Sequence, residues 1–121
     1  EYILDLPTAM DNFAHFDTPC CLVGHTHVPA VFVLDETARE LSFTLVEHGD
    51  VIDLSRHRLI VNPGGVGQPR DGDPRAAYAL LDDEAMTLAF RRVAYDVAAT
   101  QELMRAQNMP RRLIKRLAHG L

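Results

Sequence analysis

The chain has 121 residues, of which 47% are hydrophobic and 24% are charged, a composition ordinary for a globular protein that excludes a disordered chain. The formal net charge of −5 argues against a non-specific nucleic-acid-binding protein, because neutralising phosphates requires a basic surface. No apolar run approaches the roughly 18 residues that cross a membrane, and the acidic start lacks the basic region of a signal peptide. We therefore expect a cytoplasmic protein without a membrane partner and, in the absence of repeats or linkers, one domain.

The first part of the chain predicts one helix followed by three strands. Apolar residues recur at helical spacing over 9–16, and Thr8 is the expected N-cap of this helix. A short apolar strand follows at 19–23. After Pro29 the strands 30–34 and 41–46 are joined by polar residues, which predicts a hairpin.

The middle of the chain predicts further short strands. Residues Asp82, Asp83 and Glu84 form the turn of a second hairpin, with Leu88 and Phe90 on one face of its second strand. The expected strands are 51–53, 58–62, 77–82 and 87–94.

The period of the apolar residues becomes helical from Asp96 onward, with Asp96 as the expected N-cap. Pro110 begins a second helix, and Gly120 ends it. This second helix carries a basic face, which we interpret as solvated rather than as a phosphate or partner site. Its residues are Arg111, Arg112, Lys115 and Arg116.

Two histidines stand two residues apart directly after the apolar strand that ends at Val23. In extended backbone His25 and His27 project to the same side, so both imidazoles reach one small volume. Gly24 permits a sharp exit of the backbone from the strand. Because neutral imidazole is a common ligand of zinc, manganese, iron and nickel, the pattern predicts a metal site. The alternative is a pair of surface histidines in a loop.

Two histidines do not complete a metal site, since catalytic zinc uses three protein ligands and harder divalent ions take about six. The adjacent Cys20 and Cys21 point to opposite faces of their strand, so we expect buried free thiols rather than a disulfide or a nucleophile. The other histidines lack ligand-like spacing and are interpreted as surface or half-buried rings. They are His15, His48, His57 and His119.

The glycine-rich segment 62–67 follows a strand that we expect to be buried. Exposed backbone N–H groups can bind phosphate, but the segment contains neither Lys-Ser nor the pattern GxGxxG. We favour a turn whose glycines let the backbone approach the histidine segment. Arg70 and Arg75 are the nearby cations whose guanidinium groups suit a phosphate. A self-paired surface turn over 70–75 is the alternative that we favour for these arginines.

Two segments together resemble the calcineurin-like metallophosphoesterase superfamily. One is Gly-His-Thr-His at 24–27 followed by Val-Pro-Ala-Val-Phe, and the other runs from Val61 to Ala76. The chain is similar, within that superfamily, to the small prokaryotic branch of predicted phosphoesterases and diadenosine-tetraphosphatase-like proteins. The resemblance implies an α/β fold, a four-layer α-β-β-α sandwich. Residues 1–121 would be the C-terminal portion of that single domain, β-rich with terminal helices.

The active site of this superfamily is assembled from five ordered motifs, and Gly-His-Thr-His matches the last of them. The resemblance implies that His25 ligates one ion of a two-metal centre and His27 the other, the divalent ions being manganese, iron, nickel or zinc. The remaining ligands and the general acid are expected upstream of residue 1, so no catalytic residue is assigned within the chain. The site-shaping residues are Gly24, Asn62, Gly64 and Gly65, and the candidate substrate contacts are Arg70 and Arg75.

The segment from Gly49 to Asp53 spells Gly-Asp-x-x-Asp, another motif of the superfamily. In the superfamily that motif precedes the paired histidines, whereas here it follows them. We therefore interpret Asp50 and Asp53 as residues of a turn that enters a strand, not as metal ligands.

The implied reaction is hydrolysis of a phosphomonoester, phosphodiester or phosphoanhydride bond in a phosphorylated small molecule or nucleotide. In such a centre two ions about 3.5 to 4 Å apart activate water and clamp the phosphoryl oxygens. The absent N-terminal half would leave an apolar sheet face exposed, so the isolated chain should be inactive and should self-associate or recruit that half. The alternative function is a non-catalytic folding or interaction module.

Overall fold

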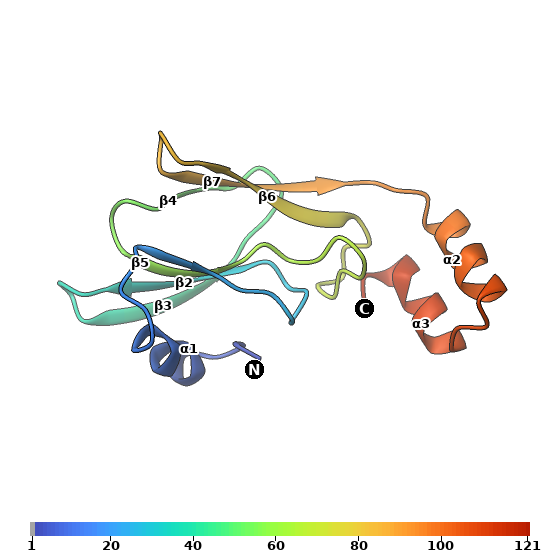
Figure 1. Cartoon of the computed structure of the whole chain (residues 1–121), viewed down its shortest axis with the longest axis horizontal. Coiled ribbons are helices and arrows are strands. Elements are labelled where there is room, and N and C mark those ends of the chain that lie inside the picture. The colour runs from blue at the N-terminus through green and yellow to red at the C-terminus, as the bar shows by residue number, and fades with distance from the viewer. Residues whose placement is uncertain (1) are drawn as a thin grey trace.

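The computed structural model describes residues 2–121, and within them seven strands form two sheets that stack on each other (Figure 1). The larger sheet has the strand order β1-β5-β2-β3. Its only parallel pair is β1 with β5, and β2 is antiparallel to both of its neighbours. The bounds are β1 Cys20–Leu22, β2 Ala30–Asp35, β3 Glu40–Leu45 and β5 Arg58–Asn62.

The smaller sheet has the order β4-β7-β6 and is antiparallel throughout. Both predicted hairpins are confirmed, since Asp35 pairs with Glu40 in the first and Asp82 with Thr87 in the second. The bounds are β4 Val51–Asp53, β6 Ala76–Asp82 and β7 Thr87–Val93.

The alternation of side chains along β5 divides the hydrophobic core into two parts. Leu59 and Val61 point toward the smaller sheet, where they join Leu88 and Phe90 of β7 in one buried cluster. Ile60 points the other way and belongs to a second cluster, with Ala9, Phe13 and Phe32. A strand buried on both faces thus holds three layers together, because each face of β5 packs on a different layer.

Helix α1, Leu6–Phe13, covers the outer face of the larger sheet (Figure 1). The sequence predicted Thr8 as its N-cap, but the cap is Asp5, whose carboxylate accepts a 2.8 Å hydrogen bond from the Thr8 N–H. The helix begins earlier than predicted because Pro7 stands in its first turn, where a missing N–H carries no cost.

The helices at the C-terminal end are α2, Val97–Ala106, and α3, Arg111–Arg116, followed by the short 3₁₀ turn η1, Leu117–His119. Asp96 caps α2 through a 2.8 Å hydrogen bond from Ala99 N–H, as predicted. Gly120 ends the last turn with a φ of +64°, a conformation that glycine adopts without strain. The predicted mixed α/β architecture, β-rich with helices at both ends, is therefore confirmed.

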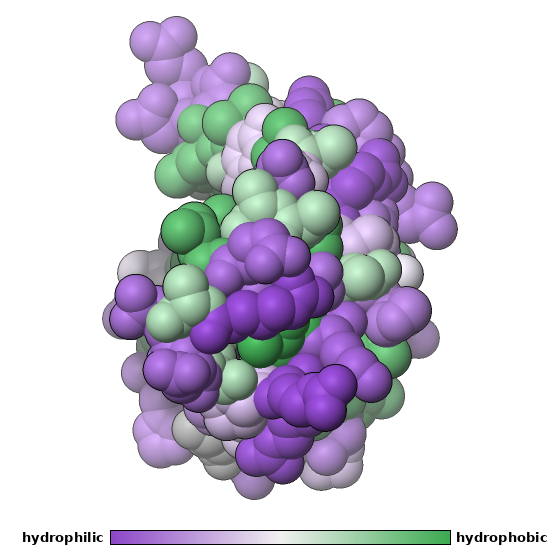
Figure 2. Space-filling view, turned by 90° about the vertical axis from the view of Figure 1, so that its right-hand side faces the viewer, coloured by the Kyte–Doolittle hydropathy of each residue, from purple (hydrophilic) through white to green (hydrophobic). Residues whose placement is uncertain are grey.

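Hydrophilic side chains cover most of the end of the molecule where α2 and α3 lie, with smaller hydrophobic areas between them (Figure 2). Arg111, Arg112 and Lys115 are exposed, in keeping with a solvated helix face, whereas Arg116 is half-buried and donates to the backbone oxygen of Leu121. None of the helices in residues 2–121 is long and apolar enough to span a membrane.

We expect Leu59→Ala to lower the free energy of unfolding by about 2 to 5 kcal/mol, because this side chain is 2% exposed and its removal leaves a cavity between the sheets. Leu45→Ala is the matched control, since Leu45 is 59% exposed on β3. Denaturant unfolding followed by circular dichroism measures both. Equal losses in the two variants would contradict the assigned core.

Candidate metal site at the end of strand β1

The paired histidines lie in a turn after β1, not in extended backbone. The φ angles of His25 and His27 are +76° and +62°, and the N–H of Thr26 donates to the carbonyl of Gly24 at 2.9 Å. The alternation argument made from the sequence is therefore wrong for these two residues. Left-handed backbone is uncommon for residues other than glycine, and strain of this kind concentrates at functional sites.

The ring of His27 has a defined hydrogen bond and one free nitrogen. Its Nδ1 lies 2.6 Å from the carbonyl oxygen of Gln68, and because a carbonyl can only accept, Nδ1 carries the proton. Nε2 then keeps its lone pair. A metal-binding histidine commonly donates its second nitrogen in this way, so the donor chemistry of His27 fits a divalent ion. Gly65 packs beside this ring, where an added Cβ would lie 3.3 Å from the ring carbon Cγ.

His25 has a different environment. It is exposed, and its ring lies against the ring of Tyr2 with the centroids 3.9 Å apart and the planes tilted by 31°. The ring of Tyr2 therefore packs against one face of this imidazole. The two predicted ligands therefore come from one turn, but only His27 is fixed by a hydrogen bond to a distant loop.

Asn62 joins the histidine turn to the glycine-rich segment. This side chain is 4% exposed at the end of β5, and its Nδ2 donates to the carbonyl of Gly24 at 3.0 Å and to Oγ1 of Thr26 at 2.7 Å. Its Oδ1 accepts from the N–H of Gly64 at 2.9 Å. The resemblance named Asn62 as a site-shaping residue, but the sequence did not reveal its partners in the histidine turn, which are 36 and 38 residues away.

Gly64 of the glycine-rich segment lies between Pro29, just before β2 of the larger sheet, and Ala77 on β6 of the smaller sheet. It has a φ of +89°, and an added Cβ would come within 2.7 Å of both Pro29 and Ala77. The predicted close approach of backbone to the histidine segment is found at the next residue, Gly65, which packs beside His27.

The two candidate substrate arginines differ in their freedom to bind a phosphate. Arg75 is held by Asp73, with its Nη2 2.6 Å from the carboxylate, and this bond lowers the pKa of Asp73. The favoured self-paired turn is thus found for Arg75. Arg70 donates from Nη2 to the side chain of Gln68 at 3.1 Å, and its buried Nε has no partner among the described residues.

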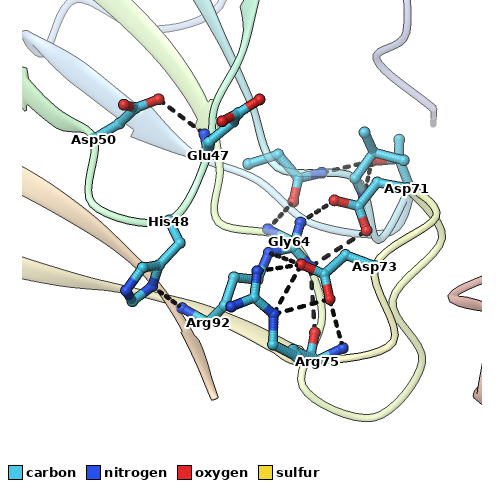
Figure 3. Close-up of polar contacts among 11 residues, drawn as sticks. Glu47, His48, Asp50, Gly64, Asp71, Asp73, Arg75 and Arg92 are labelled. Atoms are coloured by element: carbon cyan, nitrogen blue, oxygen red, sulfur yellow. Dashed lines mark hydrogen bonds and ion pairs between the residues drawn. The ribbon is translucent and has the colours of Figure 1, made fainter. Parts of the chain in front are cut away.

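An ion-pair cluster that sequence reasoning missed lies beside this loop (Figure 3). The side chain of Arg92 on β7 is only 6% exposed and forms a salt bridge with Asp71. Burial lowers the pKa of Arg92, since its charge is partly removed from water. A signal was present, because alternation places Arg92 on the same face as Leu88 and Phe90, where a charge needs a partner.

The remaining candidates for metal chemistry have structural roles. The carboxylate of Asp50 accepts from the N–H of Glu47 at 2.8 Å, and that of Asp53 accepts from Ser55 N–H at 2.8 Å, which supports the turn interpretation. Within residues 2–121 no three histidine, cysteine or acidic side chains gather as a metal cluster.

The two cysteines are free, as predicted, but half-buried rather than buried, because β1 is an edge strand. Burial raises the pKa of Cys20, which disfavours its thiolate and argues against a nucleophile.

Known proteins resemble this chain in sequence and in structure. No protein-family model matches the chain. It is 34% identical over 98 residues to an uncharacterised protein of Methanocaldococcus jannaschii, a match that spans 81% of this chain and 38% of that protein. A metallophosphoesterase from Sphaerobacter thermophilus superposes with a TM-score of 0.94 at 48% identity, over all of this chain and 50% of that one.

The chain thus spans half or less of the length of these proteins. The likeness supports the metallophosphoesterase superfamily and identifies the fold as a fragment of a metallophosphoesterase fold.

We expect Gly64→Ala to destabilise the chain by about 1 to 3 kcal/mol, because alanine is strained at this φ and its Cβ would clash with Pro29 and Ala77. Gly67→Ala is the control, since nothing lies within 4 Å of the added atom. Thermal and denaturant unfolding compare the two. If both variants unfold like the parent chain, the close contacts of Gly64 with Pro29 and Ala77 do not stabilise this segment.

Proposed function

We propose that this chain contributes part of the metal centre of a metal-dependent phosphoesterase. The observation that carries the proposal is the hydrogen bond from His27 Nδ1 to Gln68, which leaves Nε2 ready to ligate an ion. The likeness to the Sphaerobacter metallophosphoesterase supports it over the full length of the chain. Within the superfamily, we assign the chain to the small prokaryotic branch that includes diadenosine-tetraphosphatase-like proteins.

His25 and His27 would each hold one of two divalent ions, with manganese, iron, nickel or zinc as the candidates that imidazole suits. When bound, such ions act as Lewis acids that activate water and stabilise charge on the phosphoryl group. The chain itself orients the two imidazoles through Tyr2 and Gln68.

Arg70 is the better of the two candidate substrate contacts. Its Nη2 donates to the neutral side chain of Gln68, whereas the guanidinium of Arg75 is already engaged by the carboxylate of Asp73. A guanidinium without a carboxylate partner among the described residues suits the oxygens of a phosphorylated small molecule or nucleotide.

The rest of the centre comes from outside this chain. Two imidazoles are fewer ligands than a divalent ion takes from a protein, and the match covers only 50% of the Sphaerobacter enzyme. We therefore infer that the chain is the C-terminal portion of one domain and is inactive alone. The competing function, a folding or interaction module without catalysis, predicts that no partner restores hydrolysis.

An apolar strip on the open side of the sandwich is where we place the other half of the domain. Among residues 2–121, β1 pairs only with β5 and β6 only with β7, so each has an unpaired edge. Grooves of about 290 and 240 Å³ both include Leu22 and Leu81, which are more than half exposed. Strands that extend both sheets would cover this strip and satisfy the open edges.

The function is tested by joining this chain to the half of the Sphaerobacter enzyme that it does not match. We expect the joined protein to hold about two metal ions by elemental analysis and to hydrolyse an aryl phosphate or phosphodiester with added manganese. His27→Ala should abolish turnover, while His57→Ala, a substitution in an exposed turn, should preserve it. A folded, metal-free and inactive joined protein would contradict the proposal, as would two ions bound by the chain alone.

The docking strip is tested by producing the two halves separately and measuring their association by titration calorimetry. Leu81→Glu should weaken association about tenfold or more, because it places a charge in the apolar strip. Leu45→Glu should have no effect, because Leu45 lies on β3, at the edge of the larger sheet opposite β1. If Leu81→Glu binds normally, or if it instead dissolves a dimer of this chain, the other half is not the occupant.

A further inference from the structure

We propose that Arg92 is a positioning residue that fixes the tautomer of His27 through Asp71 and the loop 68–75. The proposal rests on the function proposed above and adds to it a group from the opposite sheet. Arg92 would not touch metal or substrate. Its effect would be to hold the carbonyl that keeps the proton of His27 on Nδ1.

The loop binds His27 at two points. The carbonyl of Gln68 accepts the bond from the ring at 2.6 Å, and the N–H of Arg70 donates to the backbone oxygen of His27 at 3.3 Å. Ring and backbone are therefore held by residues only two apart, so a small shift of the loop changes both bonds together.

Arg92 holds the next residues of the same loop. Its guanidinium donates to both carboxylate oxygens of Asp71, and Nη1 also donates to the carbonyl of Arg75 at 3.2 Å. Figure 3 shows Asp71, Asp73 and Arg75 gathered around this side chain. A planar guanidinium fixes direction as well as distance in such a fork, which a lysine cannot reproduce.

The arginine itself is held rigidly. It stands on β7, which pairs with both of its neighbours in the smaller sheet, and its backbone N–H donates to Nδ1 of His48 at 2.8 Å. Its side chain is almost entirely removed from solvent, so the charge depends on its carboxylate partners. The loop has a second anchor at Gly72, whose N–H donates to the carbonyl of Gly120 at 3.0 Å.

Removal of the ion pair should therefore loosen the loop without detaching it. The carbonyl of Gln68 would then no longer stay within bonding distance of Nδ1. Free imidazole favours the proton on Nε2, the nitrogen that must be bare to bind an ion. The expected consequence is a change of tautomer at His27 alone, since the ring of His25 is held by Tyr2 and not by this loop.

The test is the imidazole ¹⁵N spectrum of the ¹⁵N-histidine-labelled chain, recorded more than one unit above the ordinary histidine pKa of about 6.5. The parent chain should show His27 protonated on Nδ1. In Asp71→Asn the ratio of the Nδ1–H to the Nε2–H form should fall about tenfold, the factor associated with one lost hydrogen bond. His25 in the same spectrum is the internal control.

Two further variants keep the test decisive. Arg92→Lys retains the charge but not the fork, so we expect the same direction of change even where Asp71→Asn folds poorly. Arg75→Ala breaks the neighbouring pair with Asp73 and should leave the tautomer of His27 unchanged. An Nε2–H form in the parent chain, or an unchanged tautomer in folded Asp71→Asn and Arg92→Lys, would overturn the proposal.

A readout in the joined protein separates this inference from the proposed function. Asp71→Asn should weaken metal binding there about 10- to 100-fold, the usual effect of losing a partner of a ligating histidine. If the unsubstituted joined protein binds no metal, the function fails while the tautomer result still stands. If it binds metal and Asp71→Asn binds it equally well, the positioning role fails instead.

Discussion

The hydrogen bonds of Asn62 are the constraint on which the arrangement around the histidines depends. One buried amide binds the turn after β1 through Gly24 and Thr26, and binds the glycine-rich segment through Gly64. A buried amide left without these partners would carry a large desolvation cost, so the two loops are favoured only together. Since β5 carries Asn62 and packs on both faces, the most buried strand of the molecule also positions the candidate site.

The structure combines a firmly held imidazole with fewer candidate ligands than a metal ion requires. His27 is held by a carbonyl on one side and by Gly65 on the other, and the loop that supplies the carbonyl is tied to the smaller sheet by Arg92. Yet the described residues offer no third metal ligand, and two sheet edges lie open beside the apolar side chains of Leu22 and Leu81. Both features fit a chain that matches half of a larger enzyme.

The sequence predicted the fold well because its signals are local. Alternating apolar residues and polar turns located every strand to within about two residues, and Asp96 and Gly120 marked helix ends correctly. It failed where distant residues decide the local conformation. The turn that holds His25 and His27 in left-handed backbone is bonded by Asn62 and Gln68 from other segments, and the buried charge of Arg92 is paired with Asp71 of the loop 68–75. No periodicity in a single sequence reports such pairings.

The most direct test of the central claim is anomalous diffraction from crystals, grown with manganese, of the chain joined to the half of the Sphaerobacter protein that it does not match. The account predicts strong anomalous peaks at the imidazoles of His25 and His27, with Nδ1 of His27 still bonded to Gln68. Peaks at other residues, or a metal bound while Asn62 no longer bridges the two loops, would contradict it.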